Sequence, residues 1–217
     1  MFTPPFVQPY AQPRPGPFYN STFQFQNNTS LSQNNVEPPV MDLQYNSQLL
    51  QDKWVCETLN YMKNGTYVDL GSAEPIKGNN TYVLESRLGW RGISVDIRPE
   101  DVHSPSWTEV GRDMSMVYAA DAVMLDYKKL FQEHNMPNVI DYLSMDLEPP
   151  LLTLEALYKI PFDDYKFKCI TFETDAYREF DTVKPSRKFL ESKGYKLVAE
   201  INNQDDYWIH PDFFEIK

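Results

Sequence analysis

Acidic residues stand at the ends of four apolar, β-branched runs of the sequence, where a strand would give way to a loop. They are Asp69, Asp96, Asp121 and Asp146. In open α/β sheets, ligands bind beyond the carboxyl ends of the strands. A carboxylate there can accept hydrogen bonds from a ligand or take a proton from it. A single acid at such a position is more commonly a helix N-cap. The prediction of a ligand site therefore depends on the recurrence of an acid at four successive strand ends.

The spacing of the first two strand ends favours a nucleoside ligand without a diphosphate. Gly71 ends the run Val68-Asp69-Leu70-Gly71, and a glycine lets backbone come close to a ligand. Neither G-x-G-x-x-G nor G-x-x-x-x-G-K-[ST], the two phosphate-cradling loops, occurs here. Asp96 lies 25 positions after Gly71, where an acid accepts hydrogen bonds from ribose hydroxyls in nucleoside-binding folds. Asp121 could accept from an exocyclic amine such as that of adenine.

The rest of the chain must bring these acids to one edge of a sheet. From Asp42 onward, β-branched runs alternate with helical segments, which predicts an α/β fold with helices on both faces of a mostly parallel sheet. We expect seven strands, at Thr66–Leu70, Gly92–Asp96, Met116–Ala120, Ile140–Met145, Phe167–Phe172, Tyr195–Ile201 and Asp206–His210. We expect helices at Ser47–Met62, Thr81–Leu88, Glu100–Gly111, Leu125–His134, Leu151–Tyr158 and Ser186–Lys193.

The connection between the last two strands is short. Only Asn202–Asp205 joins them, which is too little chain for a crossover helix. The last strand should therefore run antiparallel to the others.

Composition and charge exclude several kinds of partner. With 31 Asp and Glu against 20 Lys and Arg, the net charge is −11, which predicts repulsion of phosphate backbones and no nucleic-acid partner. No apolar run approaches the length of a membrane span. Cys56 and Cys169 are far apart and belong to no metal-binding pattern. We therefore expect a cytoplasmic protein that contacts no membrane.

The first 40 residues differ from the rest in composition. They hold 8 of the 17 prolines and only two charged residues, Arg14 and Glu37. This composition predicts an arm at 1–40 that is attached to a domain at 41–217. Seven aromatic residues in the arm could dock on the domain or on a second subunit, so homo-oligomer formation through the arm stays open.

A set of short motifs lies between Ser47 and His210. They are Ser47-Gln48 with Gln51-Asp52-Lys53, Tyr67-Val68-Asp69-Leu70-Gly71, Asn80-Thr81-Tyr82-Val83-Leu84-Glu85, Leu88-Gly89-Trp90-Arg91-Gly92-Ile93, Val95-Asp96-Ile97-Arg98-Pro99, Asp141-Tyr142-Leu143-Ser144-Met145-Asp146-Leu147-Glu148 and Ile170-Thr171-Phe172-Glu173. With these motifs the chain resembles the class I S-adenosylmethionine-dependent methyltransferases, and more narrowly the FkbM type. The resemblance implies a Rossmann-like seven-stranded sheet, S-adenosylmethionine as methyl donor, and O-methylation of a sugar, a glycan or another small hydroxylated acceptor.

The resemblance and the strand ends together give a set of cofactor-binding residues. We expect S-adenosylmethionine to be held by Asp69, Gly71, Ser72, Asn80, Thr81, Asp96, Ile97, Asp121 and Ala122. The chain departs from the family pattern at Glu74-Pro75-Ile76 and at Pro149-Pro150, so the identity of the acceptor stays open. Thr174-Asp175 stands where the family tends to have His-Asn, so no histidine is predicted to act there.

Four carboxylates at the ends of the fourth and fifth strands are the candidate catalytic residues: Asp146, Glu148, Glu173 and Asp175. A hydroxyl acceptor must lose its proton, and Asp146 or Glu173 is the favoured base. Asp146, Glu173 and Asp175 could instead hold one divalent cation, which we do not favour. Among the histidines, only His210 could approach these acids. Tyr177 and Arg178 are candidate contacts to the acceptor.

Two other classes of function remain open. The domain could bind the cofactor without turnover and serve as an assembly or regulatory module through the aromatic arm. It could also be another α/β enzyme, such as a nucleotide-sugar binder or a dehydrogenase. That class needs a phosphate-cradling glycine loop, which the sequence lacks, so it is the least favoured.

Overall fold

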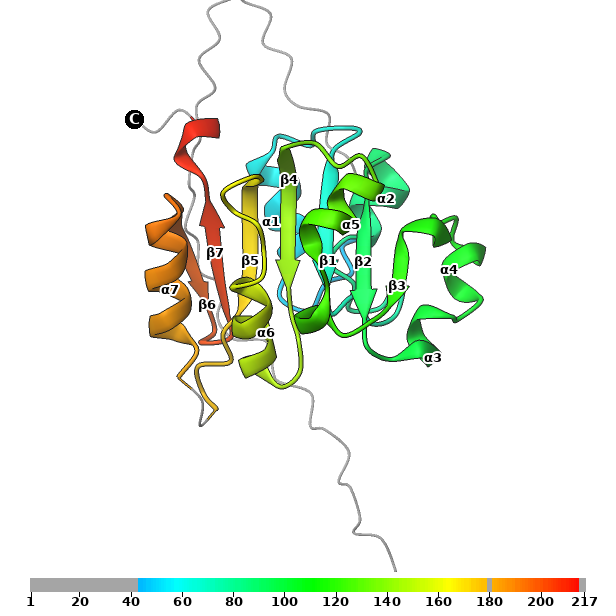
Figure 1. Cartoon of the computed structure of the whole chain (residues 1–217). Helices are drawn as coiled ribbons and strands as arrows, with labels where there is room; N and C mark the ends of the chain where they lie inside the picture. Colours follow the sequence, from blue (N-terminus) through cyan, green and yellow to red (C-terminus); the bar gives the residue numbers. More distant parts are fainter. Residues whose placement is uncertain (1–42, 179–180, 215–217) are drawn as a thin grey trace, which may run out of the picture. The chain divides into compact units, whose positions relative to one another are not determined.

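The computed structural model of the protein describes residues 43–178 and 181–214 (Figure 1). The predicted arm at 1–40 lies outside these residues, and with it every prediction about docking or oligomer formation. No helix in the described part of the chain is long and apolar enough to cross a bilayer.

A seven-stranded mixed sheet forms the centre of the domain, in the order β3-β2-β1-β4-β5-β7-β6 (Figure 1). The strands are β1 Thr66–Leu70, β2 Arg91–Asp96, β3 Val117–Ala119, β4 Val139–Met145, β5 Lys166–Glu173, β6 Lys196–Ile201 and β7 Asp205–Ile209. The first five strands pair in parallel, and β7 pairs antiparallel with both β5 and β6. The predicted α/β fold with a reversed last strand is confirmed.

Two apolar cores show that helices cover both faces of the sheet. The larger core packs α5, α6 and α7 against the strands, and the smaller one packs α1 and α2. The helices are α1 Gln51–Thr58, α2 Tyr82–Leu88, α3 Pro99–Val102, α4 Ser106–Glu109, α5 Tyr127–Glu133, α6 Pro150–Leu157 and α7 Val183–Ser192, with short 3-10 turns η1 Met114–Met116, η2 Ala122–Met124 and η3 Pro211–Phe213.

Two predicted helices differ in extent from the structure. The helix expected over 100–111 is divided into α3 and α4, because Pro105 has no N–H to donate and disfavours helical backbone at the residue before it. The helix expected over Ser47–Met62 spans only Gln51–Thr58. Ser47 instead forms a β-bridge with Gly78, and Leu50 adopts left-handed backbone with a φ of 62°.

The strand order places the loops that matter at one edge of the sheet. Because β1 to β5 are parallel, their carboxyl ends lie together at the lower edge in Figure 1. From β1 the chain runs to β2 and β3 on one side, whereas β4 and β5 lie on the other side of β1. Ligands of α/β sheets bind at such a switch point in the strand order. Because β7 is reversed, its first residue, Asp205, lies at this edge, and His210 follows its far end. His210 is thus placed away from the four candidate carboxylates.

Candidate ligand-binding site

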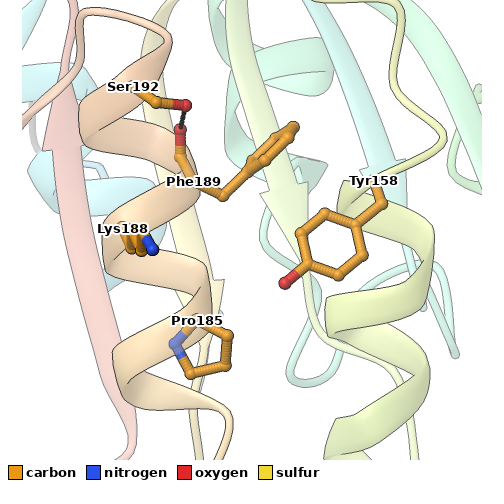
Figure 2. Close-up of a pocket in the computed structure, with 5 residues that line it drawn as sticks. All are labelled: Tyr158, Pro185, Lys188, Phe189 and Ser192. Carbon is orange, nitrogen blue, oxygen red and sulfur yellow. Dashed lines mark hydrogen bonds between the residues drawn. The ribbon is translucent and has the colours of Figure 1, made fainter.

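A cavity of about 350 Å³ opens at the switch point of the sheet. Loops that follow β1, β2, β3 and β4 contribute to its wall, together with Glu173 at the end of β5. It brings together eight residues that the sequence predicts for the site: Gly71, Asp96, Ile97, Asp121, Ala122, Asp146, Glu148 and Glu173. A smaller hollow of about 280 Å³ lies between α6 and α7, and it contains none of the predicted site residues (Figure 2).

Gly71 lets the β1 loop touch the end of β4. Its φ is +85°, and a Cβ at this position would lie 1.8 Å from the backbone oxygen of Asp146. The Gly71 N–H donates to the Val95 carbonyl at 2.8 Å, and the Asp146 N–H donates to the Leu70 carbonyl at 2.9 Å. Any other residue would push the two strand ends apart, because the clash is with backbone.

Asp96 joins the loops that follow β1 and β2 at the cavity wall. Its Oδ2 accepts from the Ala73 N–H at 2.8 Å, and its Oδ1 accepts from the Arg98 N–H at 2.9 Å. A carboxylate oxygen can accept two hydrogen bonds. Oδ2 therefore keeps the capacity to accept one more, such as from a ribose hydroxyl.

Asp121 has a structural role as well as a place in the cavity wall. Its Oδ1 accepts from the Val123 N–H at 2.9 Å, which makes Asp121 the N-cap of η2. The side chain is nevertheless exposed, so its carboxylate remains accessible from the cavity.

Four predicted cofactor residues do not line the cavity: Asp69, Ser72, Asn80 and Thr81. Asp69 is buried in β1, and the other three are buried in the loop that follows it. Asp69 is 1% exposed and accepts from Thr81 Oγ1 at 2.9 Å, and burial raises its pKa to about 6. Among the described residues, Ser72 Oγ and Asn80 Oδ1 are buried with no hydrogen-bond partner. Such atoms are costly in a folded protein and indicate a missing polar partner.

Three of the four predicted catalytic acids, Asp146, Glu148 and Glu173, line the cavity from the side of β4 and β5. Burial raises the pKa of Glu173, and the adjacent Asp146 carboxylate raises it further. Burial also raises the pKa of Asp146, with the Glu148 carboxylate adding to the rise. Two carboxylates in contact cannot both ionise readily. The pKa values of both are therefore raised, and that of Glu173, at about 11, favours a proton on Glu173 near neutral pH.

Arg178 supplies a positive charge to the same group of acids. Its guanidinium binds Glu148 through two hydrogen bonds of 2.6 and 2.8 Å, and its Nε lies 2.7 Å from Asp175 Oδ2. Asp175 does not line the cavity, but one of its oxygens lies within 4.8 Å of oxygens from Glu148 and Glu173. Oxygen ligands at this spacing could hold one hard divalent cation, although Arg178 already neutralises two of them.

Several polar residues at or beside this cavity had no predicted role. Gln48, Lys77 and Arg98 line the cavity, and Lys77 and Arg98 bring cations to a wall that also carries five acids. Asp205, at the start of β7, accepts from Gln51 Nε2 at 2.9 Å. The predicted reversal of the last strand could have signalled Asp205, because a reversed strand begins at the edge where its parallel neighbours end.

Asp205 links the stability of the domain to pH. Burial raises its pKa to about 7, and the Asp146 carboxylate contributes to the rise. An unfolded aspartate has a pKa of about 3.9, so between these two values the folded state binds more protons, and stability falls as pH rises.

We expect the free energy of unfolding of the wild type to fall between pH 6 and pH 8. The fall should be larger than that of Asp205→Asn by on the order of 1 kcal/mol. Urea denaturation of both proteins at the two pH values measures this difference. Equal pH dependence in the two proteins would show that Asp205 titrates normally.

Comparison with known proteins gives similarity at the level of solved structures alone. No family model matches the chain, and no curated protein matches it. A putative rRNA methylase from Clostridium thermocellum has 18% identity, covers 77% of this chain and 97% of its own, and has a TM-score of 0.49. A SAM-dependent methyltransferase from Aquifex aeolicus has 15% identity over 74% and 92% of the two chains, with a TM-score of 0.46.

A third similar structure is an RNA methyltransferase from Salinibacter ruber in complex with S-adenosyl-L-homocysteine. It has 17% identity over 76% of this chain and 92% of its own, with a TM-score of 0.43. At these identities and TM-scores, the similarity extends only to the general fold. The fold assignment rests on the strand order of the sheet. None of these comparisons identifies the FkbM type, which stays a prediction.

The prediction that excludes nucleic acid as a partner is wrong. Several structures similar to this chain are named as rRNA or RNA methylases. The exclusion used the net charge of −11, which averages over the whole sequence. An acceptor meets only the local surface around a cavity, so net charge does not decide among acceptor classes.

Proposed function

We propose that this protein is an S-adenosylmethionine-dependent methyltransferase that methylates a hydroxyl oxygen of a sugar or another hydroxylated acceptor. The observation that carries the proposal is the shared cavity at the switch point. Ligand-accepting carboxylates, Asp96 and Asp121, belong to one part of its wall, and the Asp146–Glu173 pair belongs to another. A nucleoside donor and an acceptor hydroxyl can therefore meet in one cavity.

The residues around the loop after β1 fit such a donor. Asp96 Oδ2 has room for a hydrogen bond from a ribose hydroxyl, and the exposed Asp121 carboxylate can accept from the adenine amine. The buried, unpartnered Ser72 Oγ and Asn80 Oδ1 provide further polar atoms in the same loop. A volume of about 350 Å³ lies within the usual range for small-ligand sites. When bound, S-adenosylmethionine supplies an electrophilic methyl carbon on a sulfonium.

The protein's own contribution is to orient the acceptor and to remove its proton. With the shared proton on Glu173, we assign Asp146, at the cavity wall, as the ionised carboxylate and the general base. Glu173 retains a proton next to it and holds the Asp146 carboxylate in place. Arg178 fixes Glu148 and the end of β5 relative to each other, which keeps the acceptor side of the cavity ordered.

Turnover with labelled S-adenosylmethionine tests the proposal. Purified protein is incubated with a panel of sugars, other small hydroxyl compounds and RNA, and transfer of the label is counted. We expect transfer to at least one hydroxyl acceptor, and we expect it to persist in the control variant Asp212→Asn, which changes an exposed acid outside the cavity. Binding of the cofactor without transfer to any acceptor would favour a non-catalytic binding module and contradict the proposal.

A further inference from the structure

Arg112 is a buried arginine that sequence reasoning did not single out. It follows Gly111 at the end of the α4 segment, and its side chain is 1% exposed. Its guanidinium contacts five groups from three parts of the chain: the Pro75 carbonyl at 3.1 Å, Asn79 Oδ1 at 3.2 Å, Tyr67 OH at 3.1 Å, Thr81 Oγ1 at 2.9 Å and Glu85 Oε2 at 2.6 Å. The Trp107 ring packs 4.8 Å from its guanidinium carbon.

Three of these contacts go to the loop that forms one wall of the cavity. Residues 71–81 connect β1 to α2, and Gly71, Ala73, Lys77 and Gly78 from this loop line the cavity. Asn79 carries the contact onward, because its Nδ2 donates to the carbonyls of Ser72 at 2.9 Å and Glu74 at 3.0 Å. Arg112 is thus linked through Asn79 to the segment 72–74 of the cavity wall.

Charge neutralisation alone does not explain this arrangement. A buried cation needs an anion, and the contact with Glu85 supplies one. The Pro75 carbonyl and the Asn79 amide oxygen are neutral acceptors, which a planar guanidinium can bind together with the acid because it presents five N–H donors in a fixed fork. A lysine ammonium in the same place would neutralise Glu85 without spanning the loop.

We propose that Arg112 is the positioning residue of the 71–81 loop, and that it sets the cavity wall in the shape that binds the donor nucleoside. Arg112 does not line the cavity, so it acts through Asn79 and Thr81. Its effect on ligand affinity rests on the proposed function, whereas its effect on the loop does not.

The test uses Arg112→Lys, which keeps the charge and removes the planar fork of N–H donors, with Arg187→Lys as a matched control. Arg187 also binds a buried carboxylate, Asp206, at 2.7 Å, but it lies on α7 and does not line the cavity. Hydrogen exchange of the loop amides is measured without ligand, and the affinity for S-adenosylhomocysteine is measured by calorimetry. Thermal unfolding of each variant confirms that it is folded at the temperature used.

We expect Arg112→Lys to speed exchange of the Ala73 and Gly78 amides by at least ~10-fold and to weaken S-adenosylhomocysteine binding by a similar factor. Arg187→Lys is expected to lower the unfolding temperature while leaving both quantities unchanged. If Arg112→Lys exchanges like the wild type in this loop, the proposed positioning role is wrong. If the wild type binds no S-adenosylhomocysteine while the exchange still changes, the loop role stands and the proposed function fails. Should Arg112→Lys not fold, Asn79→Ala, which removes the hydrogen bonds that join Asn79 to Arg112, Thr81, Ser72 and Glu74, must give the same exchange result.

Discussion

Replacing Asp146 with asparagine is expected to lower the rate of methyl transfer by roughly 10²–10⁴-fold, the usual contribution of a general base. The amide has the same shape but cannot take a proton, so binding of S-adenosylmethionine should stay close to that of the wild type. Single-turnover assays with the acceptor found in the panel, together with calorimetry, separate the two effects.

Glu173→Gln is the matched variant, because Glu173 already holds a proton in our assignment and glutamine keeps a neutral, hydrogen-bonding group. Its rate should fall much less than that of Asp146→Asn. The wild-type rate should decline as pH is lowered through the pKa of Asp146, which burial and the Glu148 carboxylate hold above the ordinary value of about 3.9. If Glu173→Gln abolishes transfer while Asp146→Asn retains it, the two roles are reversed.

The second large effect is expected for Gly71→Ala. The new Cβ would lie 1.8 Å from the Asp146 carbonyl oxygen, on backbone with a φ of +85°. Left-handed strain and overpacking together should lower the free energy of unfolding by about 2–6 kcal/mol. Since the relief of the clash must separate the ends of β1 and β4, donor binding should be lost even where the protein remains folded.

Gly111→Ala is the control for strain without a clash. Gly111 has a φ of +78°, and nothing lies within 4 Å of its added Cβ. Its cost should therefore be limited to the left-handed backbone, about 1–2 kcal/mol. Urea denaturation and calorimetry on both variants give the comparison. Equal losses of stability and of binding in the two would mean that the contact between β1 and β4 has no special role.

Much of the sheet could be predicted because its strands are short β-branched runs separated by clear breaks. All seven strands occur within one or two residues of their expected positions, and the short link before β7 correctly indicated its reversal. The helices were less predictable at their ends. Ser47 and Leu50 follow a helical pattern in sequence, but a bridge to Gly78 holds the segment before α1 in another conformation.

The site was predictable where a residue lies beyond the end of a strand. Asp146 follows β4 directly and Asp121 lies two residues after the end of β3, and parallel strands bring such residues to one cavity. Asp69 precedes the last residue of β1 and lies inside the sheet, where its side chain is covered and meets Thr81 instead of the cavity. Arg112 could not be predicted, because its partners lie 27 to 45 residues away in sequence and only tertiary packing brings them together.

The most direct test of the account is calorimetric titration of the purified protein with S-adenosylhomocysteine. The account predicts one binding site in the wild type and at least ~10-fold weaker binding in Asp96→Ala, because a charged hydrogen bond to the ribose is lost. Asp212→Ala, a change to an exposed acid outside the cavity, should bind as the wild type does. No binding by the wild type, or equal binding by Asp96→Ala, would contradict the assignment of this cavity as the donor site.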